Sequence, residues 1–327
     1  MSGTGPARSS ISLKTPAKVN LGLRLTGLRD DGYHLLESVF APIALYDDVD
    51  LVWRDGRDGV SFNLGVPPDA GLPRALAAVT DGADNLVVRA ATAFREATGM
   101  DGRLEISLTK RIPVGAGLGG GSSDAGAVLS GLSVLAGDQA LPPEELHELA
   151  LGLGADIPYF LAPEPALVTG IGEQIEPIAG LPGLALAVAN PGISVSTAEV
   201  YRLADALPDS LTAPEPGSTM RAISRLAGET GEWAPALGDL LVNDLQPAAI
   251  HLCPEVGLWL DHLRESGAVG VGMSGSGGTV FGVFLSTSEA TFAASTLQAM
   301  LEHDVEPMND AVGPIPWIRA TRILAGS

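Results

Sequence analysis

The chain has 327 residues, a net charge of −20 and a single cysteine, Cys253. The negative charge argues against a general binder of nucleic acids or membrane surfaces, which are themselves negatively charged, and one cysteine excludes an internal disulfide. Residues 1–10 lack the apolar core of a signal peptide, and no segment reaches the roughly 18 apolar residues of a membrane span. We therefore expect a cytoplasmic protein without membrane spans.

Strands are predicted where apolar and polar residues alternate, and in the first third of the chain these segments are 12–25, 39–53 and 104–108. The first is either a strand pair or a strand with a bend, and an Asp-Gly turn at 29–34 follows it. The second is expected to break at the aspartate pair 47–48. Residues 54–83 are rich in glycine, proline and aspartate and predict an irregular excursion. The pair 84–85, Asp-Asn, can cap a helix that continues through Phe94.

A glycine-rich segment follows the strand at 104–108: residues 113–126 read PVGAGLGGGSSDAG. A loop without Cβ atoms lets several backbone N–H groups converge on one anion, and the helix expected after it adds its positive N-terminal end. Ser122 or Ser123 can cap that helix, and their hydroxyls can donate to a phosphate or bind a phosphate-bound magnesium. The order of strand, glycine loop and capped helix favours a phosphate site, with a flexible surface loop as the alternative.

The glycine segment fits neither common phosphate loop. Gly115, Gly117 and Gly120 have the spacing of the dinucleotide fingerprint, but residues 111–114 separate them from the strand and the acidic residues in range are predicted on a helix. The P-loop pattern fails because no Gly-Lys-Ser/Thr occurs. No lysine or arginine lies between Arg111 and Arg202, so backbone amides and a helix dipole must hold any anion here, helped by cations from elsewhere in the fold.

Helices and strands mix without strict alternation in the rest of the chain, which indicates an α+β protein. The predicted helices are 144–153, 243–252, 255–266 and 288–303, and the predicted strands are a pair within 166–178, a buried strand at 184–189 and one at the end of the glycine-rich segment 270–284. Residues 207–235 are irregular at first and weakly helical later. The Gly/Pro-rich stretch 179–183 is the best candidate boundary, which predicts two domains, 1–178 and 179–327.

Three motifs, in the expected order, resemble those of the galactokinase, homoserine kinase, mevalonate kinase and phosphomevalonate kinase superfamily: residues 16–21, 113–123 and 273–278. A longer set resembles, more narrowly, the 4-diphosphocytidyl-2-C-methyl-D-erythritol kinase family, which acts with ATP in the non-mevalonate isoprenoid pathway: PAKVNLGL, RDDGYHLLESVF, DNLVVRAA, GLGGGSSDA, LGADIPYF and NPGISVST. The likeness extends from about residue 12 to about 320, and residues 54–83 and 207–235 match poorly.

The resemblance implies an N-terminal domain like that of ribosomal protein S5, a C-terminal ferredoxin-like domain, and a cleft between them where ATP and substrate meet. It implies phosphorylation of the 2-hydroxyl of 4-diphosphocytidyl-2-C-methyl-D-erythritol, with magnesium arriving with ATP. Asp156 would be the base and Lys18 would stabilise developing charge. From the residues alone, Asp156 is more readily a cap of a helix entered through Pro158, and Lys18 a solvated strand lysine.

The resemblance also assigns binding residues. ATP would contact Asn85 and Lys110 on the adenosine side, and the glycine segment elsewhere: Pro113, Val114, Gly115, Ala116, Gly117, Leu118, Gly119, Gly120, Gly121, Ser122 and Ser123. The cytosine would stack on Tyr33 and Tyr201, with His34 at its edge, and Asn20 and Thr197 would make polar contacts with the substrate. Asn85 as a helix cap, Tyr33 as a turn aromatic and His34 as a surface histidine are the alternatives.

Three other functions are consistent with parts of the sequence. The chain could be another small-molecule kinase of the superfamily, or a non-catalytic sugar- or nucleotide-binding protein on the same scaffold. An RNA-binding module, suggested by the S5-like fold, is disfavoured by the charge of −20. No Cys, His and acid cluster has metal-ligand spacing, so the magnesium ligands stay open, as does the choice between a monomer and a homodimer.

Overall fold

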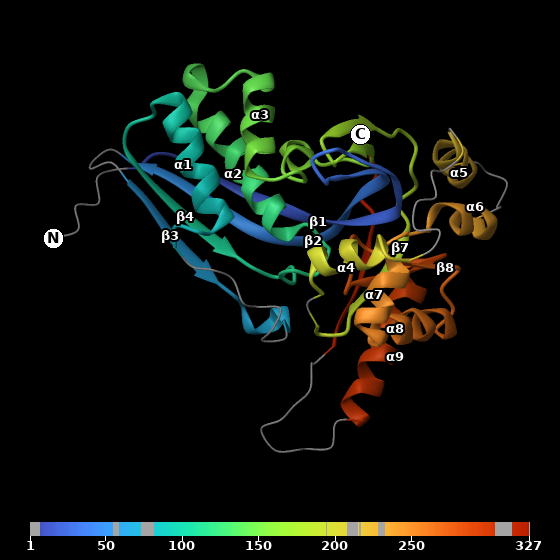
Figure 1. Cartoon of the computed structure of the whole chain (residues 1–327). Helices are drawn as coiled ribbons and strands as arrows, with labels where there is room; N and C mark the ends of the chain where they lie inside the picture. Colours follow the sequence, from blue (N-terminus) through green and yellow to red (C-terminus); the bar gives the residue numbers. More distant parts are fainter. Residues whose placement is uncertain are drawn as a thin grey trace.

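The computed structural model describes residues 7–54, 59–72, 82–193, 195–207, 215, 217–227, 233–304 and 316–326. Their strands form two sheets, one of order β3-β4-β2-β5-β6 with β1 paired to β2, and one of order β10-β7-β9-β8 (Figure 1). Two sheets with helices packed on them confirm the α+β class. The chain passes from the first sheet to the second between Pro177 and Ala185, and the domain boundary at residue 178 stays a prediction.

A long antiparallel hairpin dominates the first sheet. Its strands are β1 (Ala7–Leu28) and β2 (His34–Arg54), joined by the predicted turn, in which Gly32 has a φ of 88°. The expected break of β2 at residues 47–48 is wrong, because the strand continues through both aspartates. The Asp47 side chain is fully buried and hydrogen-bonded, so a polar pair inside this strand needs no turn.

Three helices cover one face of the first sheet (Figure 1). They are α1 (Leu86–Thr98), α2 (Gly120–Ala136) and α3 (Pro143–Leu153). Apolar residues of α1 and α2 share a buried cluster with β2 and with β4 (Arg103–Thr109). As predicted, Asn85 caps α1, and its side-chain oxygen accepts a hydrogen bond from the Val87 N–H at 2.9 Å.

The prediction that residues 54–83 form an irregular segment is wrong in part. It contains β3 (Gly59–Gly65), which pairs in parallel with β4, and a short 3-10 turn at Pro68–Ala70, while residues 55–58 and 73–81 lie outside the described part. Val60, Phe62 and Leu64 of β3 pack on the cluster formed by α1, α2 and β4. Alternating apolar residues within a Gly- and Asp-rich stretch were the available signal for this strand.

The second half of the chain contains most of its predicted elements. The hairpin β5 (Ala166–Gly170) and β6 (Gln174–Pro177), the strands β7 (Ala185–Asn190), β8 (Gly270–Met273) and β9 (Val280–Phe284), and the helices α7 (Gln246–Leu252), α8 (Pro254–Glu265) and α9 (Thr287–Asp304) are present. The weakly helical part of 207–235 contributes α5 (Ser218–Ala227) and the start of α6 (Trp233–Leu240). Sequence analysis missed α4 (Thr197–Ala204) and β10 (Trp317–Arg322).

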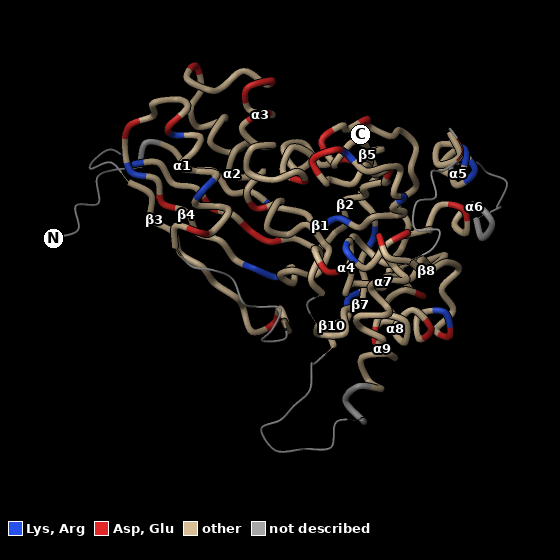
Figure 2. Tube along the Cα trace, viewed as in Figure 1, with Lys and Arg blue, Asp and Glu red and all other residues tan. Residues whose placement is uncertain are grey.

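The two sheets are joined by a common hydrophobic core. One buried cluster combines Val19 and Leu21 of β1 with Leu186 and Val188 of β7 and with Leu237 of α6. This packing places the middle of β1 beside the second glycine-rich segment. Acidic residues are spread over the whole described chain rather than gathered in one place (Figure 2). No helix in the described ranges is long and apolar enough to cross a membrane.

Candidate active site

The glycine-rich segment leaves β4 and opens α2. Gly115, Gly117 and Gly119 have φ values of 66°, 76° and 70°, a left-handed conformation that favours glycine. Helix α2 begins at Gly120 with Gly119 as its cap, so the expected cap by Ser122 or Ser123 is wrong. No side chain caps the helix, and the backbone N–H groups of a helix N-terminus without a side-chain cap are suited to bind an anion.

The two glycine-rich segments of the chain lie against each other. Ser274, which follows β8, donates from its hydroxyl to the Gly117 carbonyl at 2.8 Å. A Cβ added to Gly117 would lie 2.4 Å from the Ser274 carbonyl oxygen, so this close approach requires glycine. The Lys18 N–H donates to the Leu118 carbonyl at 2.9 Å, which ties the same loop to β1. The three motifs of the sequence therefore meet at one place.

A pocket of about 430 Å³ opens beside the first glycine segment. Its walls include most of the predicted ATP residues: Asn85, Lys110, Pro113, Val114, Gly115, Ala116, Gly117, Gly119, Gly120, Gly121 and Ser122. Two predicted contacts are absent from these walls. Leu118 is in the hydrophobic core, and the buried Ser123 hydroxyl donates to the Pro16 carbonyl at 2.7 Å.

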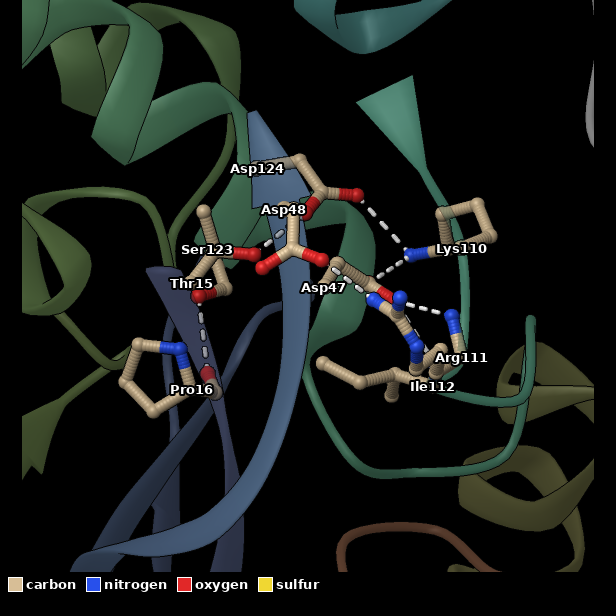
Figure 3. Close-up of polar contacts among 9 residues, drawn as sticks. All are labelled: Thr15, Pro16, Asp47, Asp48, Lys110, Arg111, Ile112, Ser123 and Asp124. Carbon is tan, nitrogen blue, oxygen red and sulfur yellow. Dashed lines mark hydrogen bonds and ion pairs between the residues drawn. The ribbon is translucent and has the colours of Figure 1, made fainter. Parts of the chain in front are cut away.

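Lys110 is held in a buried charge cluster at the edge of this pocket (Figure 3). Its ammonium donates to Asp47 at 2.5 Å and to Asp124 at 2.8 Å, and the Thr15 hydroxyl donates to the other oxygen of Asp124 at 2.7 Å. Asp47 also accepts the backbone N–H groups of Arg111 and Ile112. Lys110 precedes the glycine segment and Asp124 lies near its end, in α2, so this ion pair joins the two ends of the loop.

The cluster has two carboxylates for one ammonium, and this arrangement shifts the pKa of Lys110 and of Asp124. Burial alone would lower the pKa of the Lys110 ammonium, but the charges of Asp124 and Asp47 outweigh it and raise that pKa. Burial raises the pKa of Asp124 to about 7, against the opposing Lys110, and Asp47 adds to the rise. Lys110 therefore brings no net positive charge to the pocket. Sequence analysis missed Asp47 and Asp124 because only the fold brings them to Lys110.

A second pocket, of about 210 Å³, adjoins the first and shares Gly117 and Gly119 with it. Its lining includes five of the residues predicted for catalysis and substrate binding: Lys18, Asn20, Asp156, Thr197 and Tyr201. These residues come from β1, from the turn before Pro158 and from α4, which are far apart in the sequence. The structure thus brings both candidate catalytic residues to the loop that borders the larger pocket.

Lys18 is buried, with 4% of its surface exposed, so the reading as a solvated strand lysine is wrong. Its ammonium donates to the Asn20 side-chain oxygen at 2.5 Å and lies 4.6 Å from the centre of the Phe40 ring. Burial lowers the pKa of Lys18, and the negative charge of Asp156 opposes that shift. A charged lysine in this position is thus held by a neutral oxygen, an aromatic face and a nearby carboxylate.

Asp156 does not cap a helix. The 3-10 turn at Pro158–Leu161 has Ile157 as its N-cap, and no side chain caps it. The half-buried Asp156 lines the pocket instead, and its charge acts on Lys18. This arrangement removes the structural alternative for Asp156 and leaves a carboxylate facing the pocket that Lys18 also lines.

The aromatic residues predicted for the cytosine are not all in this pocket. Tyr33 is 61% exposed in the turn between β1 and β2, whereas Tyr201 of α4 lines the pocket. The His34 ring lies 4.9 Å from the Tyr201 ring, centre to centre, and its Nε2 is 2.6 Å from a carboxylate oxygen of Asp205. His34 thus connects the start of β2 to α4, and Asp205 is a partner that sequence analysis missed.

Comparisons with known proteins agree with this geometry. The family models for the GHMP kinases N terminal domain and the GHMP kinases C terminal match residues 85–163 and 220–303. The chain is 41% identical to a 4-diphosphocytidyl-2-C-methyl-D-erythritol kinase of Agrobacterium fabrum, over 86% of this chain and 90% of that protein. It is 39% identical to one of Syntrophotalea carbinolica, over 91% of this chain and 99% of that protein.

Solved structures give the same result. A crystal structure of 4-(cytidine 5'-diphospho)-2C-methyl-D-erythritol kinase matches with a TM-score of 0.72 and 35% identity, covering 96% of this chain and all of that one. A mevalonate kinase from L. major matches with a TM-score of 0.65 and 20% identity over 99% of both chains, which shows a shared fold. The chain therefore belongs to the 4-diphosphocytidyl-2-C-methyl-D-erythritol kinase family of the GHMP kinases.

Proposed function

We propose that this chain transfers the γ-phosphoryl group of ATP to the 2-hydroxyl of 4-diphosphocytidyl-2-C-methyl-D-erythritol. Membership of the family supports this activity. The observation that carries it is the junction of two pockets at Gly117 and Gly119, with Lys18 and Asp156 on the side of the smaller pocket. A nucleotide in one pocket and an alcohol in the other would meet at this junction.

The triphosphate would lie on the glycine segment and at the N-terminus of α2. The left-handed glycines and the cap without a side chain leave backbone N–H groups for the phosphates. Lys110 is a poor candidate for a phosphate clamp, because Asp47 and Asp124 engage its ammonium. Amides and the helix dipole would therefore supply most of the local stabilisation from the chain.

The chemistry around the larger pocket suits a magnesium ion that arrives with the nucleotide. Within the described part of the chain, no group of three or more His, Cys, Asp or Glu side chains could hold a metal ion. Asp124, the carboxylate in the wall of that pocket, already accepts hydrogen bonds from Lys110 and Thr15. Magnesium commonly binds through substrate phosphates and water in kinases, where it neutralises phosphate charge.

Asp156 and Lys18 would act on the acceptor hydroxyl. Its oxygen attacks the γ-phosphorus, the bond from that phosphorus to the β,γ-bridging oxygen breaks, and ADP leaves. Asp156 accepts the hydroxyl proton, and the Lys18 ammonium stabilises negative charge on the acceptor oxygen and on the transferred phosphoryl group. General-base assistance of this kind contributes roughly 10²–10⁴-fold.

The cytidine part of the substrate would lie toward α4. Tyr201 offers a stacking face in the smaller pocket, and the centre of the His34 ring lies 4.9 Å from the centre of that ring. Thr197 lines the same pocket, and its hydroxyl is 2.8 Å from that of Ser276. Tyr33 would have to approach from the exposed turn. We further propose a cytoplasmic enzyme that is a monomer or a homodimer, which light scattering would decide.

The test is ADP release with ATP and a panel of acceptors. We expect turnover with 4-diphosphocytidyl-2-C-methyl-D-erythritol and none with mevalonate, homoserine or unsubstituted methylerythritol, because the cytidine must be held for the hydroxyl to be placed. Lys18→Met is the control for ADP release that does not depend on the proposed active site. Turnover of mevalonate or homoserine at a comparable rate would instead assign the chain to another activity of the superfamily.

A further inference from the structure

A chain of hydrogen bonds continues from Lys18 away from the pocket. The Lys18 ammonium donates to the Asn20 side-chain oxygen at 2.5 Å, the Asn20 amide nitrogen donates to the Ser38 hydroxyl oxygen at 2.8 Å, and the Ser38 hydroxyl donates to the Gly22 carbonyl at 2.5 Å. Lys18, Asn20 and Ser38 are each at most 4% exposed. Water therefore cannot replace any of these partners easily.

The direction of each hydrogen bond in this series is determined by its last acceptor, the Gly22 carbonyl. A carbonyl oxygen only accepts, so the Ser38 hydroxyl proton is committed to Gly22 and the Ser38 oxygen is left as an acceptor. Only the nitrogen end of the Asn20 amide can donate to that oxygen. The opposite end of the amide, its oxygen, must then face Lys18. Ser38 and the ammonium thus require the same orientation of the Asn20 amide, and Ser38 holds the end that Lys18 does not contact.

An irregularity in β1 brings Ser38 to Asn20. In the β1–β2 ladder Asn20 pairs with Phe40 but Leu23 pairs with Ser38, so β1 has one extra residue at this point. Such a bulge reorients side chains and is common next to active sites. Gly22 lies in the bulge, and a Cβ there would be 2.2 Å from the Leu240 carbonyl oxygen, so the close contact with the C-terminal end of α6 requires glycine.

We propose that Ser38 is a positioning residue for the phosphoryl transfer, acting through Asn20 to aim the Lys18 ammonium into the smaller pocket; this rests on the proposed function. Without the Ser38 hydroxyl, the Asn20 amide nitrogen loses its partner, and the amide is held at its oxygen end only, by the ammonium. The orientation of the amide plane, and with it the position of the ammonium, is then less well fixed. Asn20, which lines the smaller pocket and is expected to contact the substrate, also has both ends of its amide engaged by the protein.

The test compares Ser38→Thr with Ser38→Val, which have nearly the same shape and differ in the hydroxyl. We expect Ser38→Thr to keep near-normal kcat and Ser38→Val to lower kcat about tenfold, the effect of one hydrogen bond. The KM for ATP should change less than twofold in both. Ser130→Ala is the matched control, because it removes a serine hydroxyl that donates to the Leu161 carbonyl, on the helical layer away from the smaller pocket.

The same pair in an Asn20→Ala background decides whether Ser38 acts through Asn20. There, Thr and Val at position 38 should give equal kcat, since the amide that Ser38 orients is gone. A tenfold difference that persists without the Asn20 amide, or equal kcat for the two variants with Asn20 present, would overturn the proposal. If Lys18→Met loses all turnover while Ser38→Val is unaffected, the positioning role of Ser38 is rejected and the proposed function stands. Full activity of Lys18→Met would reject the role of Lys18 itself.

Discussion

Gly117→Ala tests whether the contact between the two glycine-rich segments shapes the nucleotide site. Gly117 has a φ of 76°, and a Cβ there would lie 2.4 Å from the Ser274 carbonyl oxygen and 3.0 Å from that of Gly277. Both obstacles are backbone atoms, which cannot rotate away as a side chain could. The second segment would have to move by about 1 Å to restore a normal van der Waals distance.

The cost of this substitution follows from two terms. A left-handed alanine costs about 1–2 kcal/mol, and loss of the Ser274 hydrogen bond to the Gly117 carbonyl costs about 1 kcal/mol more. A total of about 2–3 kcal/mol, divided by about 2.1 cal/mol/K of unfolding entropy per residue, predicts a fall in Tm of about 3–4 °C for 327 residues. Because a 1 Å displacement at a reacting centre can cost about a hundredfold, kcat/KM for ATP should fall at least tenfold.

Gly121→Ala is the matched control in the same loop. Gly121 is in the first turn of α2, lacks a positive φ, and a Cβ there would have nothing within 4 Å. Alanine is a better helix former than glycine by about 1 kcal/mol, so its Tm should be unchanged or higher. Thermal unfolding and steady-state kinetics with varied ATP measure both variants. Wild-type Tm and kcat/KM in Gly117→Ala would refute the reasoning.

Three other predictions concern the smaller pocket. Asp156→Asn should lower kcat at least a hundredfold while the Kd for ADP, measured by calorimetry, stays within about twofold; near-normal turnover would remove Asp156 from the mechanism. Tyr201→Ala should raise the KM for the cytidine substrate by about tenfold, since stacking contributes about 1–3 kcal/mol. Tyr33→Ala should also raise this KM if the exposed Tyr33 ring closes on the base. An unchanged KM in both variants would discredit a stacking pocket. Because burial lowers the pKa of Lys18 and the mechanism needs its ammonium, kcat should fall as pH rises through a value below the usual 10.5; a flat profile to pH 10.5 would contradict this.

The charge cluster beside the larger of the two pockets changes how Lys110 is understood. A lysine next to a glycine loop suggests a phosphate contact, but here Asp47 and Asp124 use its ammonium to join the two ends of that loop. A buried ion pair is costly to form and more costly to break, so its role is better described as fixing a geometry than as adding net stability. The loop can then present its amides without a mobile cation among them.

Local patterns in the sequence were sufficient for much of the fold and for the glycine loop before α2. Alternation predicted β4, the Asp-Asn cap predicted the start of α1, and the glycine run predicted a loop that opens a helix, because each of these depends on neighbours within a few residues. The family likeness then supplied Lys18 and Asp156, which the structure places in one pocket.

Only the tertiary structure decided how these residues are held. Asp47 and Asp124 meet at Lys110 from different elements, and Ser38 reaches Asn20 because β1 carries an extra residue opposite it. The continuous path of β2 through two aspartates depends on hydrogen-bond partners more than sixty residues away. Contacts of this kind depend on register and packing between distant segments, and no pattern within a short window of sequence records them.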